Sequence, residues 1–249
     1  INPRIEANRA MTGGGAIDVV GALTILGGSV ATNTAVTADG GGVRVGGTAL
    51  ISATRFASNT AATSGGAISA AQPITLTRVI IERNAASDGG GVFAAAGMTV
   101  TLQGGTSAAN RLAMNNNTAR TGDGGALHAA GPVAIRSEAL FSANSAPAGE
   151  GGAFYIDSLG DDFPSSTAAT WSNNSAGGNG GAIRALGSID MCPDHPTFTG
   201  NSAGGGSSAD GGPIHASGSL FLSKGTTPPA VRSARLGGAF YSESTVFLN

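Results

Sequence analysis

A short motif of two glycines, one small residue and one large apolar residue recurs along the whole chain. Nine copies are present, and the intervals between them range from 24 residues (Gly65 to Gly89) to 35 residues (Gly89 to Gly124). Repeats of this length indicate a stacked architecture, in which one unit cannot bury its apolar face without its neighbours. The copies begin at Gly14, Gly40, Gly65, Gly89, Gly124, Gly151, Gly180, Gly211 and Gly237.

An asparagine precedes eight of these motifs and follows a large apolar residue by three positions, as in Phe56-Ala57-Ser58-Asn59. Asparagine tolerates the left-handed backbone conformation of turns, so we expect these residues to adopt it. Equivalent asparagine side chains one unit apart also form hydrogen-bonded ladders in stacked parallel sheets. We therefore predict a structural ladder, and no catalytic or ligand-binding role, for Asn8, Asn33, Asn59, Asn84, Asn117, Asn144, Asn174 and Asn201.

Short stretches of alternating apolar and polar residues lie between the motifs, for example Ile74-Thr75-Leu76 and Val133-Ala134-Ile135. This period of two is typical of β-strands, whereas no segment shows an apolar stripe of helical period. Each unit is then expected to form three short strands that pair in parallel with the same strands of the next unit. The sequence predicts an all-β fold: a single right-handed parallel β-helix of about nine coils, in which residues 1–249 form one domain.

Composition narrows the classes of function. Charged residues make up 11% of the chain against a usual ~25%, and the formal net charge is −2. No basic block is present, so we expect no nucleic-acid partner. No apolar run approaches ~20 residues, so we expect no membrane span in this segment. Because the chain begins at Ile1 and not at Met, we expect it to be a piece of a longer protein.

One position of the motif varies freely, and it lies four residues after the first glycine. The residue before it is always large and apolar and must face the interior, so strand alternation turns this position outward. Aromatic and arginine side chains are frequent in binding hot spots. We predict a docking face for a partner protein, a neighbouring protomer or a glycan; ordinary surface variability is the alternative. This outward ladder begins with Asp18, Arg44 and Ser69, and its binding candidates are Phe93, His128, Tyr155, Arg184, His215 and Tyr241.

An acidic residue directly precedes the glycine pair in several units. Asp88, Asp123 and Glu150 belong to three consecutive units, so their carboxylates are expected ~5 Å apart, where they repel one another. Such a group favours a cation with oxygen ligands, such as Ca²⁺. The interpretation that we favour is that each carboxylate accepts a glycine N–H in its own turn and is otherwise solvated. The sequence predicts no cofactor, and calcium is kept only as an alternative at these three residues.

The paired motifs resemble the repeats of chlamydial polymorphic outer membrane proteins, which combine Gly-Gly-Ala-[Ile/Leu/Val] with Phe-x-x-Asn. Here they read Phe56-x-x-Asn59 with Gly65-Gly66-Ala67-Ile68, and Phe141-x-x-Asn144 with Gly151-Gly152-Ala153-Phe154. The resemblance covers nearly the whole chain, and similar repeats occur in large extracellular proteins of bacteria and algae. It implies the surface-exposed β-helical passenger of an autotransporter, which acts as an adhesin outside the cell or at its surface.

Two functions of different classes are carried forward. The prediction is a non-catalytic, extracellular structural or adhesive segment that presents stacked faces and loops to a partner. The alternative is a polysaccharide lyase or hydrolase, because parallel β-helices include pectin-degrading enzymes. Asp161 and Asp162 have a faint likeness to a polygalacturonase acid pair, but the accompanying Ser-His-Gly and Arg-Ile-Lys motifs are missing. We therefore expect no catalytic residues.

Overall fold

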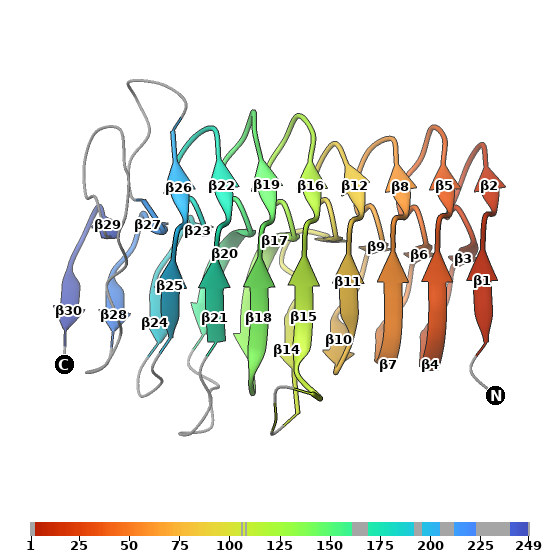
Figure 1. The fold of residues 1–249 in the computed structure, drawn as a ribbon, viewed down its shortest axis with the longest axis horizontal. Coiled ribbons are helices and arrows are strands. Elements are labelled where there is room, and N and C mark those ends of the chain that lie inside the picture. Colours follow the sequence, from red (N-terminus) through yellow and green to blue (C-terminus); the bar gives the residue numbers. More distant parts are fainter. Residues whose placement is uncertain are drawn as a thin grey trace.

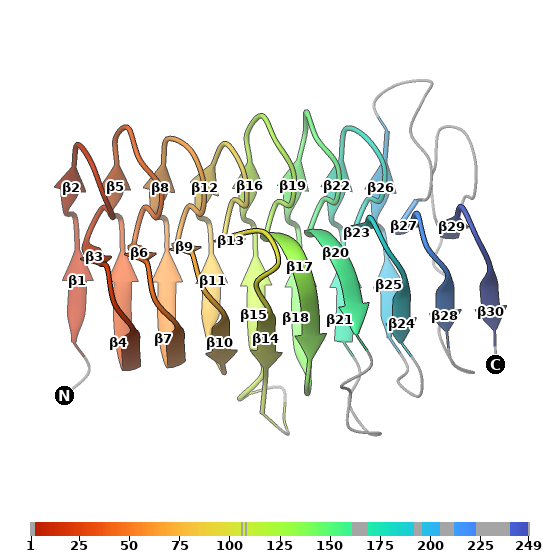
Figure 2. The same cartoon turned by 180° about the vertical axis from the view of Figure 1, so that it is seen from behind.

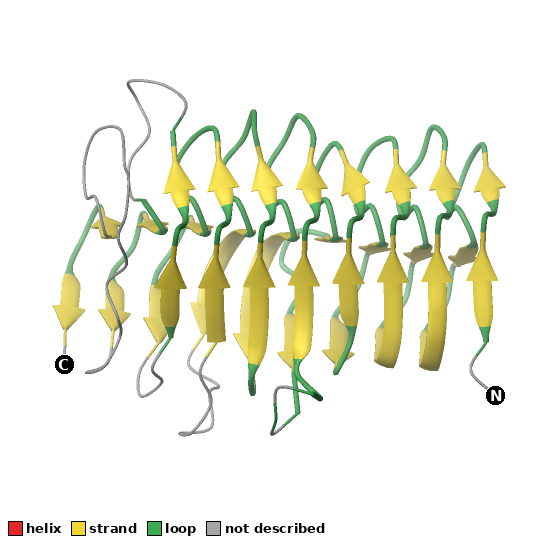
Figure 3. Cartoon of the chain, in the orientation of Figure 1, coloured by secondary structure: helices red, strands yellow, loops and turns green. Residues whose placement is uncertain are grey.

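In a computed structural model, the chain winds as a parallel β-solenoid of about eight turns (Figure 1). The structure describes residues 3–105, 107, 109–160, 169–191, 196–204, 212–222 and 240–248. The regular structure in these ranges consists of strands joined by turns and loops, as Figure 3 shows. These ranges hold no helix with the length and apolarity needed to cross a membrane. The predicted all-β parallel solenoid is thus confirmed.

We call a stack of equivalent strands from successive turns a column. One column ends just before the asparagines in the chain, and a second begins just after them. The first column carries the large residue three positions before each asparagine, and the second is a separate eight-stranded sheet formed directly after it. The first column contains β1 (Arg4–Glu6), the ends of β4 (Leu23–Ala31) and β7 (Ala49–Ala57), β11 (Ile80–Glu82), β15 (Leu112–Asn115), β18 (Ala139–Ser142), β21 (Ala169–Ser172) and β25 (Thr197–Thr199). The second contains β2 (Arg9–Ala10), β5 (Thr34–Ala35), β8 (Thr60–Ala61), β12 (Ala85–Ala86), β16 (Thr118–Ala119), β19 (Ser145–Ala146), β22 (Ser175–Ala176) and β26 (Ser202–Ala203).

Two further columns follow each glycine pair, and Figure 2 shows them from behind. The third column starts with the large apolar residue of the motif, and the fourth leads into the next turn. The third contains β3 (Ile17–Val19), β6 (Val43–Val45), β9 (Ile68–Ala70), β13 (Val92–Ala94), the starts of β17 (Leu127–Ile135) and β20 (Phe154–Gly160), β23 (Ile183–Ala185), β27 (Ile214–Ala216) and β29 (Phe240–Ser242). The fourth contains the starts of β4 and β7, β10 (Ile74–Thr77), β14 (Val100–Gln103), the ends of β17 and β20, β24 (Ile189–Met191), β28 (Leu220–Leu222) and β30 (Val246–Leu248).

The interior is filled by residues that pair in register from turn to turn. Phe56 pairs with Ile81, and further along Phe141 pairs with Trp171. The rings of Phe141 and Trp171 stack with centroids 4.2 Å apart. A parallel column therefore places one large side chain on the next, and stacking buries apolar area that a single turn would leave in water. The members of this stack that are at most 1% exposed are Phe56, Ile81, Met114, Phe141, Trp171 and Phe198.

The two glycines of the motif are required for two different reasons. Gly65 has a φ of +65°, a conformation that residues with a side chain rarely adopt. A Cβ on Gly66 would lie 2.1 Å from the carbonyl oxygen of Gly90 in the next turn. The first glycine therefore makes the corner, and the second allows the backbones of neighbouring turns to approach closely.

The asparagines stack as a continuous ladder inside the solenoid, but they are not the left-handed residues. The prediction that asparagine itself adopts that conformation was wrong, because the residue before it does so, as Ser58 does with a φ of +55°. Asn59 Oδ1 accepts hydrogen bonds from the backbone N and Nδ2 of Asn33, both at 3.0 Å. Nδ2 of Asn59 donates to Val30 O at 2.9 Å and to Asn84 Oδ1 at 3.0 Å. The left-handed residue turns the chain so that the next side chain points inward.

The same side-chain bonds join each asparagine to its equivalent in the next turn, from Asn8 to Asn201. Asn8, in the first turn, is exposed. The seven asparagines that follow are at most 1% exposed: Asn33, Asn59, Asn84, Asn117, Asn144, Asn174 and Asn201. Buried polar groups need partners, and this arrangement supplies the amides from Asn33 to Asn174 with partners from the turns on either side and that of Asn201 with partners from the preceding turn.

Candidate binding face

The outward ladder is one uninterrupted row of side chains along the third column. Each member pairs in register with the next, for example Phe93 with His128 and His128 with Tyr155. Parallel strands one turn apart lie ~4.8 Å from each other, so large neighbouring side chains can contact one another. The full order is Asp18, Arg44, Ser69, Phe93, His128, Tyr155, Arg184, His215 and Tyr241.

The ladder is more enclosed than an outward position suggests. Ser69 is 8% exposed, Arg184 is 9% exposed and His215 is 2% exposed, whereas Asp18 and Arg44 are exposed. Beyond Arg44, the ladder residues are therefore partly or fully removed from solvent. The long side chains lie against one another and against the acidic residues of the neighbouring turns, which remove them from solvent.

Aromatic rings form two groups in the ladder. The ring centroid of His128 lies 5.2 Å from that of Phe93 and 4.9 Å from that of Tyr155, with tilted planes. The centroids of His215 and Tyr241 lie 4.5 Å apart. Arg184 separates the two groups in register. Tilted contacts at these distances are favourable for aromatic pairs, so the rings hold one another in place before any partner arrives.

The acidic residues before the glycine pairs form a second row, which we call the acidic rim: Asp39, Asp88, Asp123 and Glu150. Their carboxylates do not accept the glycine N–H of their own turn, as the favoured interpretation assumed. Oδ1 of Asp88 accepts the backbone N–H of Asp123 at 2.7 Å, and Oδ1 of Asp123 accepts that of Glu150 at 2.7 Å. The acidic rim thus links successive turns much as the asparagine ladder does inside.

The acidic rim also contacts the outward ladder. Oδ1 of Asp88 lies 3.0 Å from Nδ1 of His128, and this hydrogen bond holds the pKa of the Asp88 carboxyl below its ordinary value. Burial raises the pKa of the Asp123 carboxyl. Burial, followed by the charge of Asp123, raises the pKa of the Tyr155 hydroxyl. The pKa values of the neighbouring carboxyl groups of Asp88 and Asp123 are therefore shifted in opposite directions.

Only two of the three residues predicted as calcium ligands lie in one cluster. Ligand atoms of Asp88, Asp123 and His128 lie within 4.8 Å of one another. Glu150 instead accepts from Nε of Arg184 at 3.2 Å and from Nδ2 of Asn179 at 2.7 Å. An imidazole nitrogen beside two carboxylates suits zinc and related metals better than calcium, which prefers oxygen ligands.

A groove of about 350 Å³ runs beside the ladder over β3, β6, β9 and β13, and sequence reasoning missed it. Asp18, Asp39 and Arg44 line it together with Ser69 and Phe93. It exists because Ser69 is small and because residues at the strand ends, such as Gly46 and Ala71, add little volume. The signal available in the sequence was Ser69 itself, the smallest residue of the ladder.

At the far end of the ladder, Nε2 of His215 lies 3.1 Å from Oε1 of Glu243. That hydrogen bond lowers the pKa of the Glu243 carboxyl. Nη1 of Arg184 donates to Oγ of Ser217 at 2.9 Å, so Arg184 is held by partners on two sides. The acid pair considered for an enzyme, Asp161 and Asp162, lies outside the described residues.

Comparison with known proteins gives a match to a family model. No curated protein and no solved structure matches the chain. Residues 53–71 match the Chlamydia polymorphic membrane protein (Chlamydia_PMP) repeat. This segment covers the end of β7, all of β8 and all of β9, and it contains Phe56-x-x-Asn59 with Gly65-Gly66-Ala67-Ile68. The chain therefore carries a repeat of the polymorphic membrane protein type, and the resemblance predicted from these motifs is confirmed for this segment.

Proposed function

We propose that this chain is a non-catalytic, adhesin-like β-solenoid that acts at the cell surface and docks a partner along the outward ladder. The observation that carries the proposal is the unbroken register of the ladder, whose rings are already packed against one another. Preorganised aromatic side chains bind with little loss of conformational entropy. The polymorphic membrane protein repeat at residues 53–71 supports a surface role.

The partner is a protein, a neighbouring protomer or a glycan, and in each case the solenoid contributes a long, rigid face. We also infer a right-handed coil of nine turns. In Figure 1 the chain rises along the front, passes over the top and descends behind, while successive turns advance toward the C-terminus, which supports this hand. The nine strands of the third column, from β3 to β29, support the count.

The test compares adhesion by the outward ladder with adhesion by another face. Beads coated with the protein are brought to cultured cells and to a layer of the same protein, and the detachment force is measured. The double variant Tyr155→Ser/Tyr241→Ser is expected to weaken attachment by about tenfold or more, because buried aromatic anchors dominate interfaces. The matched control is Leu50→Ser/Ile80→Ser, which removes two exposed apolar side chains from other columns.

Equal detachment forces for the two double variants would contradict the proposal. The competing function, a polysaccharide lyase or hydrolase, is tested with the same preparation. Release of reducing sugars from polyuronides by the wild-type protein would favour the enzyme and remove the non-catalytic assignment.

A further inference from the structure

The groove beside the first half of the outward ladder differs chemically from the rest of the face. It lies over β3, β6, β9 and β13, and Phe93 lines it. His128 contacts Phe93 in register from the following turn, whereas on the preceding turn Phe93 pairs with the small Ser69. The ring of Phe93 therefore borders open space on the side of Ser69.

The charges around the groove do not cancel. Nε and Nη2 of Arg44 donate to the two carboxylate oxygens of Asp18 at 2.9 and 3.0 Å. The hydrogen bond with Asp18 and, to a smaller extent, the charge of Asp39 raise the pKa of Arg44. The groove thus holds two carboxylates and one guanidinium, which leaves a net charge of about −1.

Asp39 is the carboxylate without its own cation. Its Oδ1 accepts from the backbone N of Ser64 at 3.0 Å and from the hydroxyl of Thr63. Among the described residues, no arginine or lysine forms an ion pair with Asp39, Asp88 or Asp123. Asp88 and Asp123 therefore continue the negative potential of the groove along the ladder, as far as Glu150, which pairs with Arg184.

We propose that this groove binds the guanidinium or ammonium end of an arginine or lysine side chain carried by a partner protein. The inference rests on the proposed docking function and names the chemistry of the partner. A cation is attracted to an aromatic face and to a carboxylate at once. The apolar stem of the same side chain fits against Val19, Ala70 and Ala71 in the lining.

The volume and charge of the groove favour an arginine or lysine side chain over a sugar or a bare metal ion. A volume of about 350 Å³ lies near the lower limit of small-molecule pockets, ~300–1,000 Å³, so it admits one side chain more readily than an oligosaccharide. A neutral sugar can donate hydrogen bonds to Asp39 but carries no charge to compensate it, and an acidic sugar is repelled by it. A bare metal ion leaves the ring of Phe93 and the apolar lining without a role.

The experiment measures binding of a defined probe to the whole chain by fluorescence anisotropy. The probe is a labelled peptide of alternating glycine and arginine, and its matched control carries citrulline in place of arginine, which keeps the shape and removes the charge. The arginine peptide is expected to bind, the citrulline peptide to bind at least about threefold more weakly, and added salt to weaken binding of the arginine peptide.

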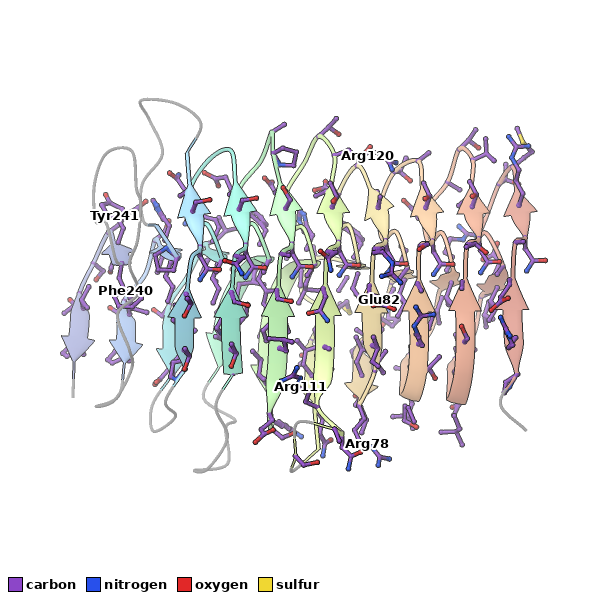
Figure 4. The ribbon with its side chains drawn as sticks, in the orientation of Figure 1. Arg78, Glu82, Arg111, Arg120, Phe240 and Tyr241 are labelled. Carbon is purple, nitrogen blue, oxygen red and sulfur yellow. The ribbon has the colours of Figure 1, made fainter. Side chains whose placement is uncertain are left out.

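Two variants test the groove residues, and a third controls for net charge. Asp39→Asn keeps an oxygen to accept from Ser64 and removes the charge, and Phe93→Leu keeps the apolar volume and removes the ring. Each is expected to weaken binding about three- to fivefold. Glu82→Gln removes a carboxylate from β11, on the front of the solenoid in Figure 4, where it pairs with Arg55. This control is expected to leave binding unchanged.

Three results would overturn the inference. They are equal binding of the two peptides, equal weakening by Glu82→Gln and Asp39→Asn, and displacement of the arginine peptide by a neutral oligosaccharide such as cellohexaose. A metal chelator is expected to change nothing, and loss of binding on chelation would assign the site to a metal ion instead. If the arginine peptide does not bind while Tyr155→Ser/Tyr241→Ser still reduces adhesion, only this inference is wrong and the proposed docking function stands.

Discussion

At the scale of single residues, the asparagine ladder explains how a chain with so few charges keeps polar groups inside its core. Asn117 Oδ1 accepts from both the backbone N and Nδ2 of Asn84. Its own Nδ2 donates to Ile81 O and to Asn144 Oδ1. Four hydrogen bonds therefore depend on one amide, and a neighbour on either side loses a partner when that amide is removed.

Asn117→Ala is expected to lower the free energy of unfolding by about 2–4 kcal/mol, because it leaves buried donors and an acceptor unpaired. The measurement is equilibrium denaturation in urea. Asn116→Gly is the matched control, because Asn116 is exposed and has a φ of +55°, which glycine adopts without strain. The control is expected to stay within about 0.5 kcal/mol of the wild type. A similar loss in both variants would argue against the ladder as a source of stability.

Asp88 and Asp123 are expected to give stability opposite dependences on pH. Folding lowers the pKa of Asp88, so its ionised form stabilises the fold above the unfolded pKa, and this contribution is lost as the pH falls through the folded pKa. Folding raises the pKa of Asp123. Its ionisation therefore destabilises the fold above the folded pKa, and the penalty disappears as the pH falls below the unfolded pKa.

At neutral pH, Asp88→Asn is therefore expected to lower the free energy of unfolding and Asp123→Asn to raise it. Both differences should shrink in acid, where the carboxyl groups of the wild type are protonated. Urea denaturation at a series of pH values measures them. If both variants changed the free energy of unfolding in the same direction at neutral pH, the opposite pKa shifts of Asp88 and Asp123 would be contradicted.

At the scale of elements, the corner between the second and third columns sets the shape of each turn. Gly65 turns the chain, and Gly66 lets the corner of the next turn pack directly against it. Because the large residue of the motif follows two positions after Gly66, the same corner fixes which side chain enters the core and which joins the outward ladder. Register along the ladder therefore begins at the glycines.

Gly66→Ala is expected to destabilise the protein by at least about 2 kcal/mol, because the new Cβ would meet the carbonyl oxygen of Gly90 at 2.1 Å. Gly21→Ala provides the matched control, since a Cβ there has nothing within 4 Å, and it is expected to be neutral within about 0.5 kcal/mol. Thermal and urea denaturation of the two variants measure the difference. Equal stability would mean that neighbouring turns are not in close contact at the corner.

At the scale of the whole molecule, the sequence predicts what is repeated and fails where a contact depends on a single turn. Between Gly40 and Gly180, the first glycines of the motifs share one backbone conformation, and the asparagines from Asn33 to Asn201 are all buried in one ladder, so their spacing was enough to place them. The groove beside Ser69, the turn of Glu150 toward Arg184 and the burial of His215 could not be predicted in this way. They depend on how far a variable side chain extends toward the next turn. The spacing of the motifs carries no information about that.

The left-handed residue shows the same limit at one position. A turn residue was expected near each asparagine, and the chemistry of asparagine favoured that residue itself. The structure places the asparagine side chain inside, where the ladder bonds hold it, and so the preceding residue adopts the left-handed conformation. A buried ladder outweighed a local preference of the backbone.

One measurement tests the register on which the binding face and the groove both depend. In a chain with Cys192→Ser, the pair Ser69→Cys and Phe93→Cys occupies partner positions on β9 and β13. Paired Cα atoms one turn apart lie ~4.8 Å from each other, within the range that a disulfide bridges, whereas a two-turn separation of ~9.6 Å lies outside it. Under mild oxidation this pair is predicted to form an intramolecular disulfide, and Ser69→Cys with His128→Cys is predicted not to. A disulfide in the second pair and none in the first would contradict the continuous outward ladder.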